Sequence, residues 1–254
     1  MIHLEFRDAT LVATLERNEQ NTIDEHLADA LDHALEQAEH HGIAVLHLRS
    51  STPHFCGGAD PARVRRWLDP DGAAGLGTDG GRWARLFERI ENSPVVAFAE
   101  MRGNALGAGL GLALACDLRI AAASARIGVP EVRVGLLPAG MTVQRLTELG
   151  GIVTAQRLLL GGDIIDGAEA HRLGLVHWIA ADDALESNAA VTVQRVAKQS
   201  SAALREAKRV LASARSGGRD QTAAIEKTAF ERLIADEEPR RRIESLLGRL
   251  DARS

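Results

Sequence analysis

The chain has 254 residues, a hydrophobic fraction of 45% and a net charge of −5, which allows one large domain with a sizeable core, or a domain with an appendage. The negative charge and an aromatic content of only 3%, with no tyrosine, argue against binding to nucleic acid or to an anionic membrane surface. The two cysteines lie in unrelated segments and indicate neither a disulfide framework nor a metal site, so we expect a cytoplasmic protein.

The first sixty residues predict a hairpin, a helix, a strand and the start of a second helix. Residues 2–6 and 11–15 alternate apolar and polar side chains as two strands do, and this start does not resemble a secretion signal. Asp24 is placed to cap a helix that runs to His40 and ends at Gly42. A buried strand is expected over 43–48, and a short helix near Asp60.

The middle of the chain continues this alternation, and its end is helical. Residues 69–81 are rich in glycine and predict a loop, which is followed by a helix over 82–90. A strand over 94–101 then leads through a glycine-rich turn into another helix, and a strand follows over 118–122. From Asp182 onward helical periods dominate, with breaks expected at 216–218 and at Pro239.

The glycine-rich turn carries the first chemical signal, with Gly103, Gly107, Gly109 and Gly111 before an apolar run. Glycine lets a ligand or a second backbone segment approach closely, and a helix start presents free N–H groups with a partial positive charge. This combination suits the stabilisation of an oxyanion, although packing alone would also explain small residues here. The glycine spacing does not match a dinucleotide fingerprint, and flanking charged residues exclude a membrane helix.

Glu131 carries the second signal, because it follows Pro130 and stands among apolar residues. Burial of its carboxyl group would raise the pKa and make it a competent general base. The same position would equally suit the partner in a structural ion pair.

The chain resembles the crotonase superfamily, the enoyl-CoA hydratase/isomerase family, over nearly its whole length. Each matching motif is weak alone, but all of them occur in order and at compatible spacing. The matching segments are 17–21 (RNEQN), 55–60 (FCGGAD), 103–117 (GNALGAGLGLALACD), 130–138 (PEVRVGLLP), 144–146 (QRL) and 168–176 (AEAHRLGLV). The resemblance implies an α/β fold: a crotonase-type (ClpP/crotonase-like) spiral of repeated ββα turns over 1–195. A helical C-terminal region over 196–254 would then support a homotrimer or a hexamer.

The resemblance also implies an acyl-CoA site and a place in fatty acid metabolism. The backbone N–H groups of Ala59 and Ala108 match the two donors that hold the thioester carbonyl oxygen in this family and stabilise an enolate. Gly58, Asp60, Gly107 and Gly111 are expected beside them as substrate-binding residues, and Asp60 is also expected to cap a helix. Coenzyme A is expected as the carrier of the substrate, with no other cofactor and no metal. The expected partners are an acyl-CoA and further copies of this chain.

One departure from the family pattern bears on the reaction. Gly111 stands where many hydratases of the family have the first of two glutamates, whereas Glu131 matches the second. A single carboxylate suits a double-bond isomerase, in which one group removes a proton and returns it at another carbon. Three alternatives stay open: a hydratase of reduced efficiency, an acyl-CoA hydrolase or decarboxylase, and a catalytically silent CoA-binding protein.

The other departure lies at residues 139–143, AGMTV, where the family usually has a run of glycines. Met141 adds bulk near the start of a helix beside the site. It either shapes the acyl pocket as a substrate-binding residue or fills the core, for which methionine is well suited.

Overall fold

The computed structural model describes residues 1–66 and 72–251. Its centre is a six-stranded sheet in the order β1-β2-β3-β4-β6-β9. The hairpin of β1 (Ile2–Arg7) and β2 (Thr10–Leu15) is antiparallel, as predicted, and every later pairing in this sheet is parallel. The other strands are β3 (Val45–Ser50), β4 (Val96–Met101), β6 (Leu118–Ala122) and β9 (Trp178–Ala180).

A second, three-stranded sheet contains β5 (Asn104–Leu106), β7 (Arg126–Gly128) and β8 (Ile164–Asp166). Cys56 extends it through a parallel bridge to Ala105. The chain passes from β4 in the large sheet to β5 in the small one, then through a helix to β6 and β7, which repeat the step. This is the predicted spiral of ββα turns.

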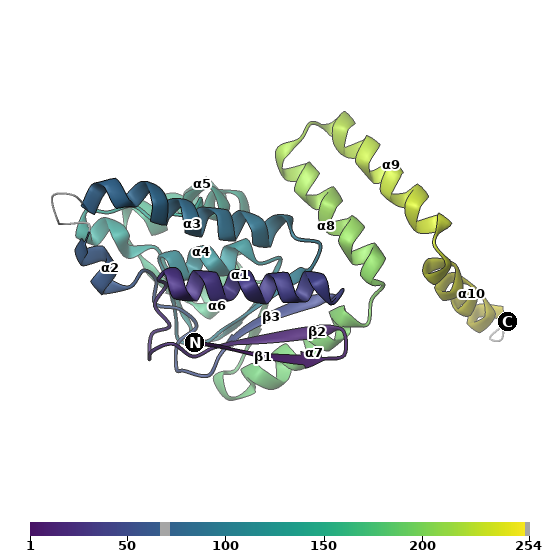
Figure 1. Ribbon diagram of the computed structural model, residues 1–254, viewed down its shortest axis with the longest axis horizontal. Helices are drawn as coiled ribbons and strands as arrows, with labels where there is room; N and C mark the ends of the chain where they lie inside the picture. Colours follow the sequence, from purple (N-terminus) through teal and green to yellow (C-terminus); the bar gives the residue numbers. More distant parts are fainter. Residues whose placement is uncertain (67–71, 252–254) are drawn as a thin grey trace.

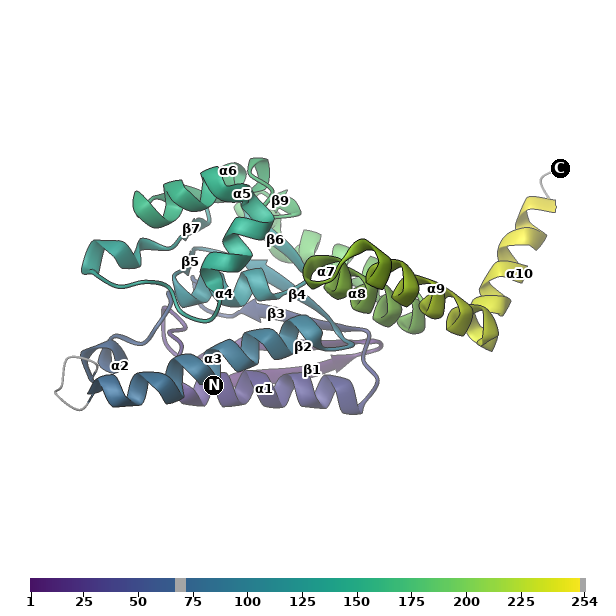
Figure 2. The same ribbon diagram turned by 90° about the horizontal axis from the view of Figure 1, so that it is seen from above.

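Helices α1 (Glu25–His40) and α3 (Gly72–Asn92) lie side by side over the large sheet (Figures 1 and 2). The side chain of Asp24 caps α1, as predicted, by accepting a hydrogen bond of 2.9 Å from the N–H of Leu27. The predicted loop over 69–81 is wrong from Gly72 onward, where the chain is helical; residues 69–71 lie outside the described part. The later part of α3 buries Trp83, Leu86, Phe87 and Ile90 in the core, and helices in proteins are stabilised more by such packing than by helix propensity.

The helical C-terminal region extends away from the two sheets (Figures 1 and 2). The break between α8 and α9 at 217–218 is the predicted one, but the break predicted at Pro239 is wrong. The chain turns at Asp236 instead, and Pro239 lies in the first turn of α10, where its missing N–H has no helical acceptor to lose. The remaining helices are α2 (Pro61–Arg66), α4 (Ala108–Ala115), η1 (Pro130–Val134), α5 (Thr142–Leu160), α6 (Gly167–Arg172), η2 (Asp182–Ala184), α7 (Leu185–Ala197), α8 (Ser201–Ser216), α9 (Arg219–Ala235) and α10 (Glu237–Asp251).

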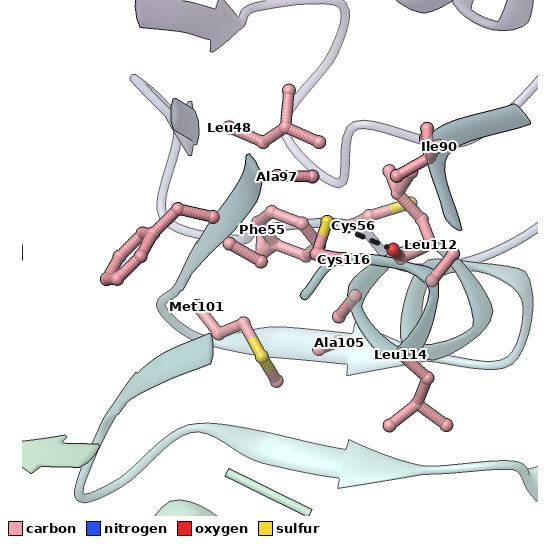
Figure 3. Packing of buried hydrophobic residues seen from close by; sticks show 14 of the residues in the cluster. Leu48, Phe55, Cys56, Ile90, Ala97, Met101, Ala105, Leu112, Leu114 and Cys116 are labelled. Atoms are coloured by element: carbon pink, nitrogen blue, oxygen red, sulfur yellow. Dashed lines mark hydrogen bonds between the residues drawn. The ribbon is translucent and has the colours of Figure 1, made fainter. Parts of the chain in front are cut away.

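Both cysteines are free and belong to the core around α4 (Figure 3). The thiol of Cys116 donates a hydrogen bond of 3.4 Å to the carbonyl oxygen of Leu112. Burial raises the pKa of each thiol to about 12, so both are protonated at neutral pH and act as small apolar side chains. In the described residues, no helix is both long and apolar enough to cross a membrane.

Candidate active site

The first oxyanion donor predicted from the sequence, the N–H of Ala59, lies in a segment held by backbone hydrogen bonds on either side of it. The N–H of Ile23 donates to Gly58 O at 2.7 Å, and the N–H of Asp60 donates to Ile23 O at 2.9 Å. Ala59 N–H lies between these two bonds and has no acceptor among the described residues. Gly58 has a φ of 103°, and a side chain there would come within 2.9 Å of Leu106 O, so the position requires glycine.

Asp60 turns its side chain toward Arg17 and not into the space beside Glu131. One carboxylate oxygen accepts hydrogen bonds from Arg17 Nη1 at 2.8 Å and Thr22 Oγ1 at 3.0 Å, and the other accepts from the N–H of Ala62 at 2.8 Å. Burial acts to raise the pKa of Asp60, but these hydrogen bonds together lower it below its usual value. Asp60 therefore caps α2 and ties the segment of Ala59 to Arg17. Sequence reasoning placed Arg17 in a motif without assigning this contact.

The second predicted donor, the N–H of Ala108, is the first of helix α4. An N–H at this position has no acceptor within its own helix, and no other described residue accepts from it. Gly107 precedes it with a φ of 54° and donates its own N–H to Gly128 O at 2.9 Å. A Cβ atom on Gly107 would overlap Oε1 of Glu131. Glycine at this turn thus brings the helix start against the Glu131 carboxylate.

Glu131 lies on the 3-10 helix η1 and is partly buried. Its Oε2 atom is buried without a hydrogen-bond partner, and its carboxylate forms no ion pair among the described residues. Burial raises the pKa of Glu131, and its own backbone N–H only partly offsets that effect. Glu131 is therefore not the partner in an ion pair among the described residues. Its carboxyl group has the environment expected of a general base.

A cavity of about 350 Å³ brings the predicted residues together. Glu131 and the exposed Arg133 are the charged side chains of its described lining, which is otherwise mostly apolar. Trp83 of α3 and Val64 of α2 form part of the wall, and the sequence singled out neither of them. The lining consists of Gly57, Gly58, Ala59, Val64, Trp83, Leu106, Gly107, Ala108, Pro130, Glu131, Arg133, Val134, Leu136, Leu137 and Ala139.

Two further predicted site residues lie outside the cavity, as Asp60 does. Gly111 is buried in α4, one turn beyond Gly107, and does not line the cavity. Met141 has a left-handed backbone and a side chain that is 55% exposed at a second cavity, beside Glu91 and Arg145. Met141 therefore does not fill the core, and a role in shaping the acyl pocket stays a prediction. A strained turn, which the sequence pattern did not reveal, rotates it outward.

The described residues contain no group of three or more histidine, cysteine, aspartate or glutamate side chains placed to hold a metal ion.

A comparison of this sequence with protein-family models agrees with the motif order, with the spiral and with the two free N–H groups beside a carboxylate. The family model for enoyl-CoA hydratase/isomerase matches residues 5–252. The chain belongs to the enoyl-CoA hydratase/isomerase family. Solved structures agree: DspI of Pseudomonas aeruginosa has a TM-score of 0.91 at 29% identity, covering 98% of this chain and 94% of that one. An enoyl-CoA hydratase from Polaromonas sp. JS666 has a TM-score of 0.91 at 27% identity, covering 98% and 97%. The crotonase fold is thereby confirmed.

Curated relatives of the family match a shorter part of the chain. Enoyl-CoA hydratase domain-containing protein 2, mitochondrial, from Mus musculus is 40% identical over 175 residues, which are 68% of this chain and 57% of that protein. A probable enoyl-CoA hydratase from Bacillus subtilis (strain 168) is 34% identical over 174 residues, 68% of this chain and 66% of that protein. The chain thus spans less than two thirds of the length of these relatives.

Proposed function

We propose that this protein isomerises the double bond of enoyl-CoA thioesters, with Glu131 as its single general base. The observation that carries the proposal is one carboxyl group with a raised pKa and an unpaired oxygen, in a mostly apolar cavity that also holds two free N–H groups. No second carboxylate belongs to the described lining of that cavity.

The reaction needs one proton to leave and return. The thioester carbonyl oxygen accepts hydrogen bonds from the N–H groups of Ala59 and Ala108. Glu131 takes a proton from the carbon next to the thioester of a 3-enoyl-CoA, and the electron pair of that C–H bond spreads into a dienolate whose negative oxygen the two N–H groups stabilise. Glu131 then returns the proton two carbons along. The product is the conjugated 2-enoyl-CoA, and the carboxylate is regenerated.

Hydration makes a different demand on the same site, because a water molecule must be held and activated as well. The family's two-glutamate arrangement supplies two groups for that water, and here Gly111 occupies one of the two positions. A relative named enoyl-CoA isomerase/hydratase, from Mycosarcoma maydis, is 36% identical over 137 residues, 54% of this chain and 48% of that protein. Its name supports isomerisation as a reaction open to this family. Coenzyme A enters this scheme as part of the substrate, and the scheme requires no other cofactor.

The test is product analysis after incubation with a 3-enoyl-CoA. Isomerisation leaves the mass unchanged and creates a conjugated thioester, whereas hydration adds one water. We expect the conjugated isomer as the main product. A 3-enoyl-CoA left unchanged, with hydration of a 2-enoyl-CoA supplied in its place, would identify a hydratase instead, and release of free coenzyme A would identify a hydrolase.

We also propose that the chain assembles as a homotrimer or as a dimer of trimers, as the family resemblance implies. Large apolar side chains are exposed on the loop at the cavity mouth and on the C-terminal helices. Exposed apolar surface of this kind does not stabilise a monomer and is typical of contacts between subunits. Examples are Val134 (73%), Leu137 (78%), Leu211 (65%) and Phe230 (62%). Light scattering at micromolar concentration should report a trimer or a hexamer, and a monomer would contradict the proposal.

A further inference from the structure

The place beside Gly111 is filled by another residue. A Cβ atom built on Gly111 would overlap the hydroxyl oxygen of Thr142 and would lie 3.1 Å from Cε2 of Phe87. Thr142 is fully buried and Phe87 is 1% exposed, so neither side chain moves aside into solvent. The Thr142 hydroxyl is also fixed, because it donates a hydrogen bond of 2.6 Å to Ala139 O.

The space beside Gly111 lies on the side of α4 toward Glu131, so filling it with Thr142 affects which groups can reach the reacting atoms. Gly107 caps the N-terminus of α4, and its carbonyl oxygen accepts a hydrogen bond of 3.0 Å from the N–H of Gly111, so it lies one turn before Gly111 toward the start of the helix. Gly107 faces the carboxylate of Glu131. Side chains on a helix lean toward its N-terminus, so a long side chain at position 111 would lean toward Gly107 and Glu131. That path begins at the atom that Thr142 now occupies.

We propose that Thr142 is a specificity-determining residue, whose hydroxyl group fills the space beside Gly111 and thereby restricts the site to one carboxylate. The inference rests on the proposed isomerase function and extends it to a residue outside the cavity wall. Gly111 and Thr142 lie in the two segments where the sequence departs from the family pattern. In the structure these two residues are in contact: the small Gly111 leaves a space, and the larger Thr142 fills it.

The packing part of the proposal is tested by thermal unfolding, which needs no substrate. Gly111→Ala at an unhindered helix position should raise the Tm by about 2–4 °C. Here we expect it to lower the Tm by at least about 2 °C, because the new methyl group meets the Thr142 hydroxyl. In a Thr142→Ala background, where the nearest remaining atom of residue 142 is Cβ at 3.5 Å, the same change should be at least about 2 °C more favourable. Thr142→Ser keeps the hydroxyl and is the matched control, which should give no relief.

The chemical part is tested by hydration of a short 2-enoyl-CoA. Gly111→Glu alone should fold poorly and gain little hydration. Gly111→Glu with Thr142→Ala should hydrate at least about 10-fold faster than Gly111→Glu alone or Gly111→Glu with Thr142→Ser, a gain below the full contribution of a general acid or base.

Two results would overturn the proposal. One is the same Tm change for Gly111→Ala in the Thr142→Ala and Thr142→Ser backgrounds. The other is a Gly111→Glu single variant that hydrates as fast as its combination with Thr142→Ala. The isomerase proposal fails separately: it is judged on the product made by the unaltered protein, whereas the Tm comparison stands without any substrate.

Discussion

Replacing Glu131 with glutamine should lower kcat for isomerisation of a 3-enoyl-CoA by at least about 10²-fold, the scale of general acid–base catalysis. Glutamine keeps the shape of the side chain but takes up no proton at neutral pH. The cavity's described lining offers no other carboxylate to replace it. Steady-state kinetics on the purified variant measures the effect. Full activity in Glu131→Gln would show that another group moves the proton.

A matched control and a pH profile separate this role from a structural one. Glu36→Gln makes the same chemical change at an exposed position on α1 and should leave kcat unchanged. Burial raises the pKa of Glu131 above its ordinary value of 4.5. The base is active only when deprotonated, so kcat/KM of the unaltered protein should fall on the acid side with a midpoint above pH 4.5. The residual activity of Glu131→Gln should lack that limb.

Replacing Ala108 with proline should lower kcat at least about 10²-fold, the usual effect of losing one oxyanion donor. Proline has no N–H, and the first position of a helix is where it fits best. Gly107 has φ 54° and ψ −124°, the mirror image of the extended conformation that a residue before proline requires, and glycine adopts it freely. The helix should therefore persist while the donor is lost.

Ala108→Gly is the matched control, because it removes a methyl group and keeps the N–H. It should retain most of the activity, and circular dichroism should show the same helix content in both variants. If Ala108→Pro turned over substrate at the rate of Ala108→Gly, the N–H of Ala108 would have no part in stabilising the enolate.

The fold was predictable wherever local signals agree with the final packing. The hairpin, the Asp24 cap and the break at 217–218 follow from alternation, from a side-chain oxygen and from glycine, all of which act within a few residues. The helix from Gly72 was not predictable, because its glycine-rich sequence has low helix propensity and the described packing of α3 lies at Trp83 and beyond. Pro239 misled the prediction because a proline ends one helix and starts another with equal ease.

Two features of the site could be predicted from short motifs in the sequence. They are the small residues around the two N–H donors and the single carboxylate. The sequence did not show that Trp83 lines the cavity, or that Arg17 holds the segment of Ala59 through Asp60. It also gave no sign that Thr142 fills the space beside Gly111. Each of these depends on which side chains from distant segments face one another. Only a departure from the glycine run at 139–143 marked the region of Thr142.

The most direct test of the central claim follows a 3-enoyl-CoA in deuterated water by NMR and mass spectrometry. We predict conversion to the conjugated 2-enoyl-CoA without addition of water. Deuterium taken up through Glu131 should enter the product two carbons along from the carbon next to the thioester, and Glu131→Gln should lose both conversion and uptake. The absence of both conversion and deuterium uptake, with hydration of a 2-enoyl-CoA supplied in place of the 3-enoyl-CoA, would contradict an isomerase that works through an enolate and one carboxylate.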